Sequence, residues 1–69
     1  MSHYVAVIVG PAGLQTYLAH GREVSYEHAT HHPHPSSAWR AAREYRLRNG
    51  GVFTYGVIDT RDPEMVVPE

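Results

Sequence analysis

The sequence predicts a small α+β fold in which one α-helix packs on one face of an antiparallel β-sheet of three to five strands. Three observations indicate this class. Three stretches of strand length precede residue 31, one helical stretch follows, and a further strand-like stretch begins at residue 52. The expected order is strand-strand-strand-helix-strand. The 69 residues contain no repeat, so residues 1–69 form a single small domain. A domain of this size hides only about 60% of the surface of its unfolded chain, which makes a partner an expected source of further burial.

The first expected strand covers residues 3–10, which are rich in β-branched side chains and apolar on both faces. The two faces alternate: Tyr4, Ala6 and Ile8 share one, and Val5, Val7 and Val9 share the other. This pattern is typical of a central strand that is covered on two sides. Because one helix covers one side only, the second face predicts either a wrapped loop or a partner subunit, with a homodimer as one form of the latter.

The next segments predict a hairpin followed by a third strand. Residues 10–13 (Gly-Pro-Ala-Gly) have turn composition, and residues 14–19 alternate as a strand does. The dipeptide His-Gly at 20–21 predicts a two-residue hairpin turn, because glycine adopts positive φ without strain. A short helix over residues 11–20 is the alternative interpretation. Residues 23–30 alternate again and predict the third strand.

The helix is the most clearly delimited element of the sequence. Residues 31–35 contain two prolines, which disfavour helical geometry in the residues before them, so this segment is expected to be an extended loop. Ser36 or Ser37 is the expected N-cap. The glycine pair at 50–51 is the expected stop.

The C-terminal part predicts a strand, a turn and a short edge strand. Residues 52–59 alternate with apolar side chains on both faces, and Gly56 indicates a bulge or a close approach of backbone. Residues 61–64 (Arg-Asp-Pro-Glu) are expected to turn the chain. Residues 65–67 then have the composition of a short edge strand.

At about 100° per residue, the expected helix has two distinct faces. Its core face is a stripe of small residues and one tyrosine: Ala38, Ala41, Ala42 and Tyr45. A second group lies outside this stripe and predicts a docking patch for a protein partner: Trp39, Arg43, Arg46 and Leu47. Tryptophan and arginine are enriched among the residues that dominate binding energy at interfaces. The alternative is that Trp39 folds over the edge of the sheet while Leu47 is an isolated exposed side chain.

The formal charge is −1, but positive and negative residues are separated along the chain. Four arginines share the helical segment with only one acid: Arg40, Arg43, Arg46 and Arg48. The acidic residues of the C-terminal segment predict a second contact, with a basic surface of the partner: Asp59, Asp62 and Glu64. A small nucleic-acid-binding regulator that uses the arginine helix is the alternative. No known nucleic-acid-binding motif accompanies that helix, and the acidic segment would repel phosphate.

Four histidines precede the helix with the spacing H-x2-H-H-x-H: His28, His31, His32 and His34. Imidazole binds zinc, nickel and copper, so a His-rich metal-binding domain is a further alternative. A structural zinc site, however, uses four ligands on rigid elements, often with cysteine, and this chain has no cysteine. We therefore predict no metal and no cofactor, and interpret the histidines as part of a solvated loop. A pH-sensitive hinge is another interpretation, because histidine titrates near neutral pH.

The sequence does not predict an enzyme or a membrane protein. It contains no recognisable catalytic motif, and we expect a chain of this size not to enclose a cleft of about 300 Å³, the lower limit of ordinary ligand sites. No run approaches the roughly 18 apolar residues that span a bilayer. The first residues lack the pattern of a signal peptide. A soluble, cytoplasmic protein is expected.

In its short length, lack of cysteine, single α+β domain and separated charge, the chain resembles small proteins of phages and mobile elements that inhibit bacterial defence complexes, the anti-CRISPR proteins among them. Those proteins share no common motif, so the resemblance assigns no role to any residue. It implies a stoichiometric inhibitor that covers a surface of a larger nucleoprotein complex. The leading hypothesis is accordingly a non-enzymatic protein-binding module.

Overall fold

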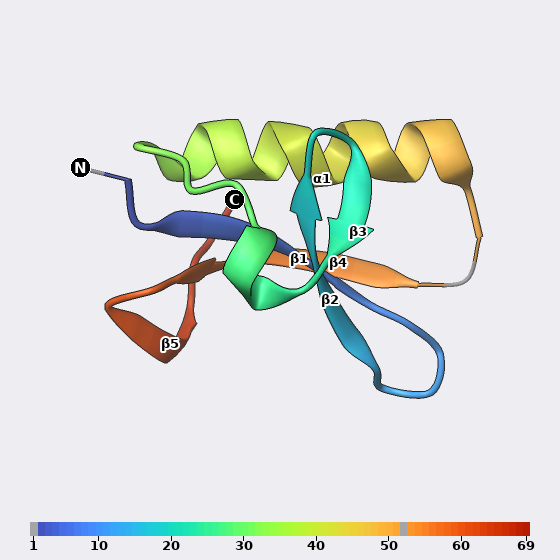
Figure 1. The fold of residues 1–69 in the computed structure, drawn as a ribbon, viewed down its shortest axis with the longest axis horizontal. Helices are drawn as coiled ribbons and strands as arrows, with labels where there is room; N and C mark the ends of the chain where they lie inside the picture. Colours follow the sequence, from blue (N-terminus) through green and yellow to red (C-terminus); the bar gives the residue numbers. More distant parts are fainter. Residues whose placement is uncertain (1, 52) are drawn as a thin grey trace.

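The computed structural model describes residues 2–51 and 53–69, and in them a five-stranded antiparallel sheet carries one α-helix on one face (Figure 1). The strand order is β3-β2-β1-β4-β5. The elements follow one another as β1 (Tyr4–Val9), β2 (Gln15–Ala19), β3 (Arg22–Val24), the 3₁₀ turn η1 (Tyr26–His28), α1 (Pro35–Asn49), β4 (Thr54–Asp59) and β5 (Asp62–Val66). The predicted α+β class is confirmed, with the fifth strand supplied by the C-terminal segment.

Strand β1 lies in the middle of the sheet and is buried on both faces. Ala6 and Ile8 face α1, while Val5, on the opposite face, is 0% exposed. The opposite face is covered by the chain itself. Tyr17 lies across from Val7 in the β1–β2 ladder, and the ring of Tyr26 in η1 stacks edge-on against Tyr17 with 5.2 Å between centroids. The wrapped-loop alternative is therefore what the structure contains, and the double-sided strand no longer gives a reason to expect a second subunit.

The β2–β3 hairpin forms as predicted, and the alternative helix over residues 11–20 was wrong. His20 and Gly21 both have positive φ, 53° and 76°, as a tight two-residue hairpin turn requires. The positive φ at His20 is tolerated because the turn is held by strand pairing on both sides, from Ala19 opposite Arg22 onwards.

The predicted third strand over residues 23–30 was too long. Strand β3 ends at Val24, and the chain then leaves the sheet edge through η1. It returns beside β1, where the Thr30 amide donates to the Leu18 carbonyl (3.0 Å), and Tyr4 and His32 exchange two backbone hydrogen bonds (3.1 and 2.7 Å). These tertiary hydrogen bonds satisfy the backbone of the returning segment. The alternation of its side chains had predicted instead that it would continue the hairpin as a longer third strand.

The helix begins earlier than predicted, and its stop is confirmed. His34 is the N-cap, with extended geometry and no side-chain capping bond, so the prediction of Ser36 or Ser37 was wrong. Pro35 occupies the first turn, where its fixed φ suits the helix and its missing N–H would be unpaired in any case. At the other end, Gly50 has φ 63° and its amide donates to the Arg46 carbonyl at 2.8 Å.

Alanines let α1 approach the sheet closely, as the core stripe predicted. Ala38 and Ala42 are both 0% exposed. Ala42 packs in one cluster with Ala6, Ile8 and Leu18, around which Tyr45, Phe53 and Tyr55 are partly buried. Ala38 packs in a second cluster with Val57 and Val67, bordered by Tyr4 and Trp39. The core of the domain is thus a thin apolar layer between α1 and the sheet.

The turn between β4 and β5 lies at Thr60 and Arg61, not over residues 61–64 as predicted. Asp59 holds this turn, because its carboxylate accepts hydrogen bonds from the amide of Arg61 (2.9 Å) and from the guanidinium (3.0 and 2.8 Å). Pro63 then falls inside β5, where an edge strand tolerates the loss of one N–H.

The β4 segment differs from the prediction in two details. The register irregularity of β4 with β5 lies between Ile58 and Asp59, so the bulge predicted at Gly56 was wrong. A Cβ added at Gly56 would meet the Val7 side chain at 3.7 Å, an ordinary contact, so no close backbone approach requires this glycine either. The predicted start of the strand at residue 52 lies outside the described residues.

Candidate functional site

The outer face of α1, opposite its alanine stripe, is an exposed surface of arginines around one leucine. At about 100° per residue, Arg40, Arg43 and Leu47 lie in line on the side of the helix that points away from the sheet. All three are exposed, and Leu47 is 81% exposed. We call this surface the outer helix face. It contains two of the four residues of the predicted patch.

Trp39 belongs to the edge of the core rather than to the outer helix face. It packs beside the buried cluster of Ala38, Val57 and Val67, and its ring lies 6.0 Å from that of Tyr55 in an edge-on arrangement. Its indole Nε1 is buried and has no hydrogen-bond partner among the described residues. The structure therefore places Trp39 as in the alternative interpretation, folded over the edge of the sheet.

Arg46 lies between the outer helix face and the sheet. Its guanidinium is 5.7 Å from the centroid of the Tyr55 ring and 5.9 Å from that of Phe53. At these distances the ring faces attract the cation and restrict its side chain. Trp39, Tyr55, Arg46 and Phe53 thus form a continuous aromatic and cationic row along the junction of α1 with β4.

Of the acidic residues predicted as a second contact, Asp59 and Asp62 are register partners across the β4–β5 turn, but they do not present one shared acidic surface. Asp59 is only 9% exposed and is engaged by Arg61, whose hydrogen bonds lower the pKa of Asp59 to about 2. Asp62 and Glu64 are exposed on β5. The acid that does reach the predicted patch is Glu69, whose carboxylate pairs with the Arg43 guanidinium.

The role of Glu69 was not predicted from the sequence. Arg43 and Glu69 are 26 positions apart, and no local periodicity relates a helix to a segment on the far side of two strands. One signal in the sequence could have indicated this contact, namely the apolar pair before Pro68. Val67 of that pair is 8% exposed and anchors the last residues on the helix.

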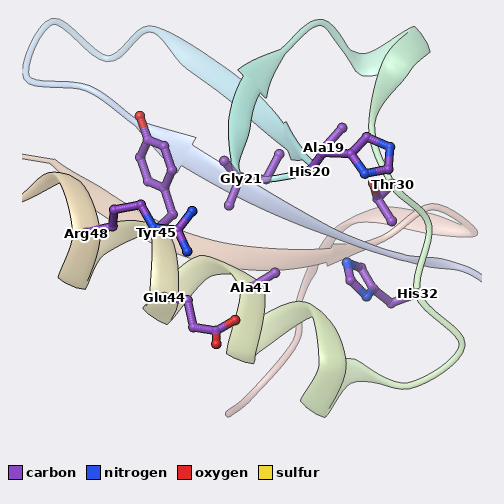
Figure 2. A pocket seen from close by; sticks show the side chains of 10 residues that line it. Ala19, His20, Gly21, Thr30, His32, Ala41, Glu44, Tyr45 and Arg48 are labelled. Atoms are coloured by element: carbon purple, nitrogen blue, oxygen red, sulfur yellow. The ribbon is translucent and has the colours of Figure 1, made fainter.

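A half-open cleft lies on the other flank of α1, between the helix, the β2–β3 turn and the segment at residues 30–32 (Figure 2). Its volume is about 350 Å³, so the expectation that a chain of this size would not enclose such a cleft was wrong. Leu18, Ala19 and Ala41 contribute apolar surface. The polar side chains that border it are His20, Thr30, His32, Glu44, Tyr45 and Arg48.

The polar groups of the cleft come from opposite ends of it. In Figure 2 the His32 ring points from the returning segment towards α1, while the Arg48 guanidinium reaches across to the hairpin turn. An added Cβ at Gly21 would lie 3.1 Å from the Arg48 guanidinium, which places that group directly over the turn. The Tyr45 hydroxyl is engaged elsewhere, since it donates to Glu23 at 2.7 Å.

The histidines do not converge. The His31 Nδ1 atom lies 3.1 Å from the Ala29 carbonyl oxygen, and its ring packs on Tyr26 at 6.3 Å, whereas His32 turns into the cleft. Within residues 2–51 and 53–69, no three side chains of the types that bind metal lie together. The arrangement therefore gives no support to the metal-binding alternative.

His32 is expected to make the stability of the fold depend on pH. Partial burial, and then the neighbouring His31, lower the pKa of His32 below its usual 6.5. The unfolded chain therefore binds this proton more readily, so the free energy of unfolding should fall as the pH drops below about 6.5 and level off below the folded pKa. Urea titrations between pH 8 and 5 measure this.

In the variant His32→Gln the contribution of His32 to this slope should be absent. The matched control is His28→Gln, which removes an exposed histidine and keeps His32. An equal pH dependence in wild type and His32→Gln would contradict the assignment.

No model of a protein family, no curated protein and no solved structure matches this chain significantly. Among the described residues, no helix is long and apolar enough to cross a membrane. The function is accordingly argued from the geometry of the outer helix face and the grooves beside it.

Proposed function

We propose that this protein is a non-enzymatic module that binds a larger protein or nucleoprotein complex through the outer helix face. The observation that supports this proposal is the position of Leu47, 81% exposed in line with Arg40 and Arg43. A leucine this exposed adds little to the core of the fold. On a partner it would supply the apolar centre of a small interface, with the arginines as a charged rim.

The row of aromatic side chains next to this face favours binding in a second way. Arg46 is held over Tyr55 and Phe53, and the Trp39 ring packs edge-on against Tyr55. A side chain whose position is already restricted loses less entropy when a partner immobilises it. Trp39 would then contribute by holding the position of Tyr55 in this surface.

The exposed acids of β5 support a more specific form of the proposal, in which the module covers a basic surface of a nucleoprotein complex. Asp62 and Glu64 lie at the edge of the sheet, where they would meet a basic surface of the same partner. Basic surfaces of nucleoprotein complexes bind phosphate, so a module of this kind would act as a stoichiometric inhibitor that covers such a surface. An inhibitor of a bacterial defence complex is one member of that class.

The test is capture of the partner from the native host with the intact protein and two matched variants. Leu47→Asp places a charge at the centre of the outer helix face, and Leu14→Asp does the same at a leucine of the β1–β2 loop that is 72% exposed. Both variants should stay folded, because both sites are at the surface. An aspartate at the centre of the interface would be buried there as an unpaired charge, so Leu47→Asp should weaken capture by at least about tenfold.

Leu14→Asp should capture the partner as the wild type does. Equal capture by both variants would remove the outer helix face from the proposal. Capture of DNA or RNA alone, with an affinity that falls steeply as the salt concentration rises, would instead favour the nucleic-acid regulator.

A further inference from the structure

The C-terminal segment lies across the first half of α1, next to the predicted patch. Strand β5 pairs with β4 at Ile58 and Asp59, and beyond Val66 the chain leaves the strand. Val67 is buried against Ala38 and Val57, and the last residues continue over the helix to Arg43. The tail therefore rests on the helix through one apolar anchor and one ion pair.

A groove of about 320 Å³ lies between this tail and the helix. One wall belongs to α1 and the other to the tail: Pro35, Ser36, Trp39, Arg40 and Arg43 face Pro68 and Glu69. The tryptophan and the two prolines contribute apolar surface. The two arginines contribute positive charge, part of which Glu69 balances. The groove thus combines an apolar surface with positive charge, which suits an extended acidic peptide.

We propose that this groove is a binding site for an extended acidic peptide segment of the partner protein, and that Glu69 in its wall is an internal competitor for Arg43. The inference rests on the proposed function and adds the class of partner. Its main support is the tail itself. Pro68 lines the groove and the Glu69 carboxylate pairs with Arg43, so a carboxylate already contacts the cationic side of the groove.

The tail is held weakly enough to be displaced. Both partners of the Arg43–Glu69 ion pair are about half exposed, with 52% and 53% of their side-chain surface open to solvent, and such surface pairs contribute little. Pro68 has no N–H to donate. In the described part of the chain, neither Pro68 nor Glu69 takes part in a backbone hydrogen bond of a turn or loop.

A second copy of the chain fits this surface less well than an acidic peptide. Two outer helix faces brought together would oppose the arginines of one copy to those of the other, Arg40 and Arg43 in particular. Like charges in contact oppose association. An exchange of tails between two copies would avoid this repulsion. Such a dimer differs from the monomer in mass, which sedimentation measures.

The experiment uses the fluorescence of Trp39, which is the only tryptophan of the protein and lines the groove. The probe is the acetylated, amidated peptide Glu-Val-Pro-Glu-Glu, and its control has glutamine at every glutamate. The proteins are the full chain, the variant Glu69→Gln and the double variant Arg43→Gln/Glu69→Gln. Far-UV circular dichroism checks that each is folded, as expected for two exposed positions.

Glu69→Gln should bind the acidic peptide about two- to fivefold more tightly than the wild type, because the internal carboxylate no longer competes for Arg43. The emission of Trp39 should shift on binding. The double variant should lose about two- to fivefold of that affinity, and the glutamine peptide should cause no comparable shift.

Three results would overturn the inference: no change of Trp39 emission with the acidic peptide, equal affinity of wild type and Glu69→Gln, or equal binding of the glutamine peptide. A dimer of the wild type that dissociates in Glu69→Gln, measured by sedimentation, would assign the groove to a second copy. A thymidine oligonucleotide that binds where the peptide does not would assign it to phosphate.

The outcome is separable from that of the proposed function. Leu47 does not line the groove, so Leu47→Asp should bind the acidic peptide as the wild type does. Loss of partner capture in Leu47→Asp without peptide binding by any variant would keep the outer helix face and reject the groove. Binding of the acidic peptide, together with unchanged partner capture by Leu47→Asp, would keep the groove and reject the outer helix face.

Discussion

Replacing Trp39 with alanine is expected to lower the free energy of unfolding by about 3 kcal/mol, the lower end of the range for such a truncation because the side chain is only partly buried. The indole packs beside the Ala38, Val57 and Val67 cluster and against Tyr55. A domain of 69 residues has a total stability of about 3–10 kcal/mol. A loss of about 3 kcal/mol removes between about a third and all of that stability, so the variant should be clearly less stable than the wild type.

Urea unfolding followed by far-UV circular dichroism measures this, since the variant has no tryptophan to observe. Trp39→Phe keeps an aromatic ring at the site and should retain more of the stability. Leu47→Ala, at an exposed position of the same helix, should stay within about 0.5 kcal/mol of the wild type. A Trp39→Ala variant as stable as Leu47→Ala would mean that the indole does not support the core.

The second large effect is expected from Ala42→Leu, which should cost about 3 kcal/mol of stability, the upper end for an overpacked core site. Ala42 is 0% exposed and faces Ala6 and Ile8 of the central strand. Small side chains set the distance between helix and sheet here. A leucine has no open volume to enter, so α1 would have to move away from the sheet.

The matched control is Ala41→Leu, one position earlier on the same helix. Ala41 borders the half-open cleft of about 350 Å³ beside the β2–β3 turn, where a larger side chain finds room. This variant should lose less than about 1 kcal/mol. Equal losses at both positions, measured by chemical unfolding, would show that the close packing of Ala42 does not control the response.

Much of the fold could be predicted because it is encoded locally. The alternation in β1, the positive-φ turn at His20 and Gly21 and the stop at Gly50 depend on the side-chain period of a strand and on the φ preferences of single residues. The alanine stripe of α1 was predicted for the same reason, since the helical period alone brings Ala38 and Ala42 to one face.

The errors lie where distant segments compete for the backbone. Residues 25–30 alternate like a strand, yet the chain leaves the sheet because hydrogen bonds to Leu18 and Tyr4 hold its next part beside β1. The helix starts at Pro35 because a proline suits the first turn better than the serines that follow it. These choices depend on partners that the local pattern does not reveal.

The candidate site divides in the same way. Helical periodicity is enough to predict that four arginines share the helix with a leucine outside its core stripe. The packing of Trp39 beside Val57 and Val67, and the contact of Glu69 with Arg43 across 26 positions of sequence, follow from the folded structure alone. The physical reason is that burial and ion pairing depend on which segments the folded sheet brings together, and spacing along the chain carries no record of that.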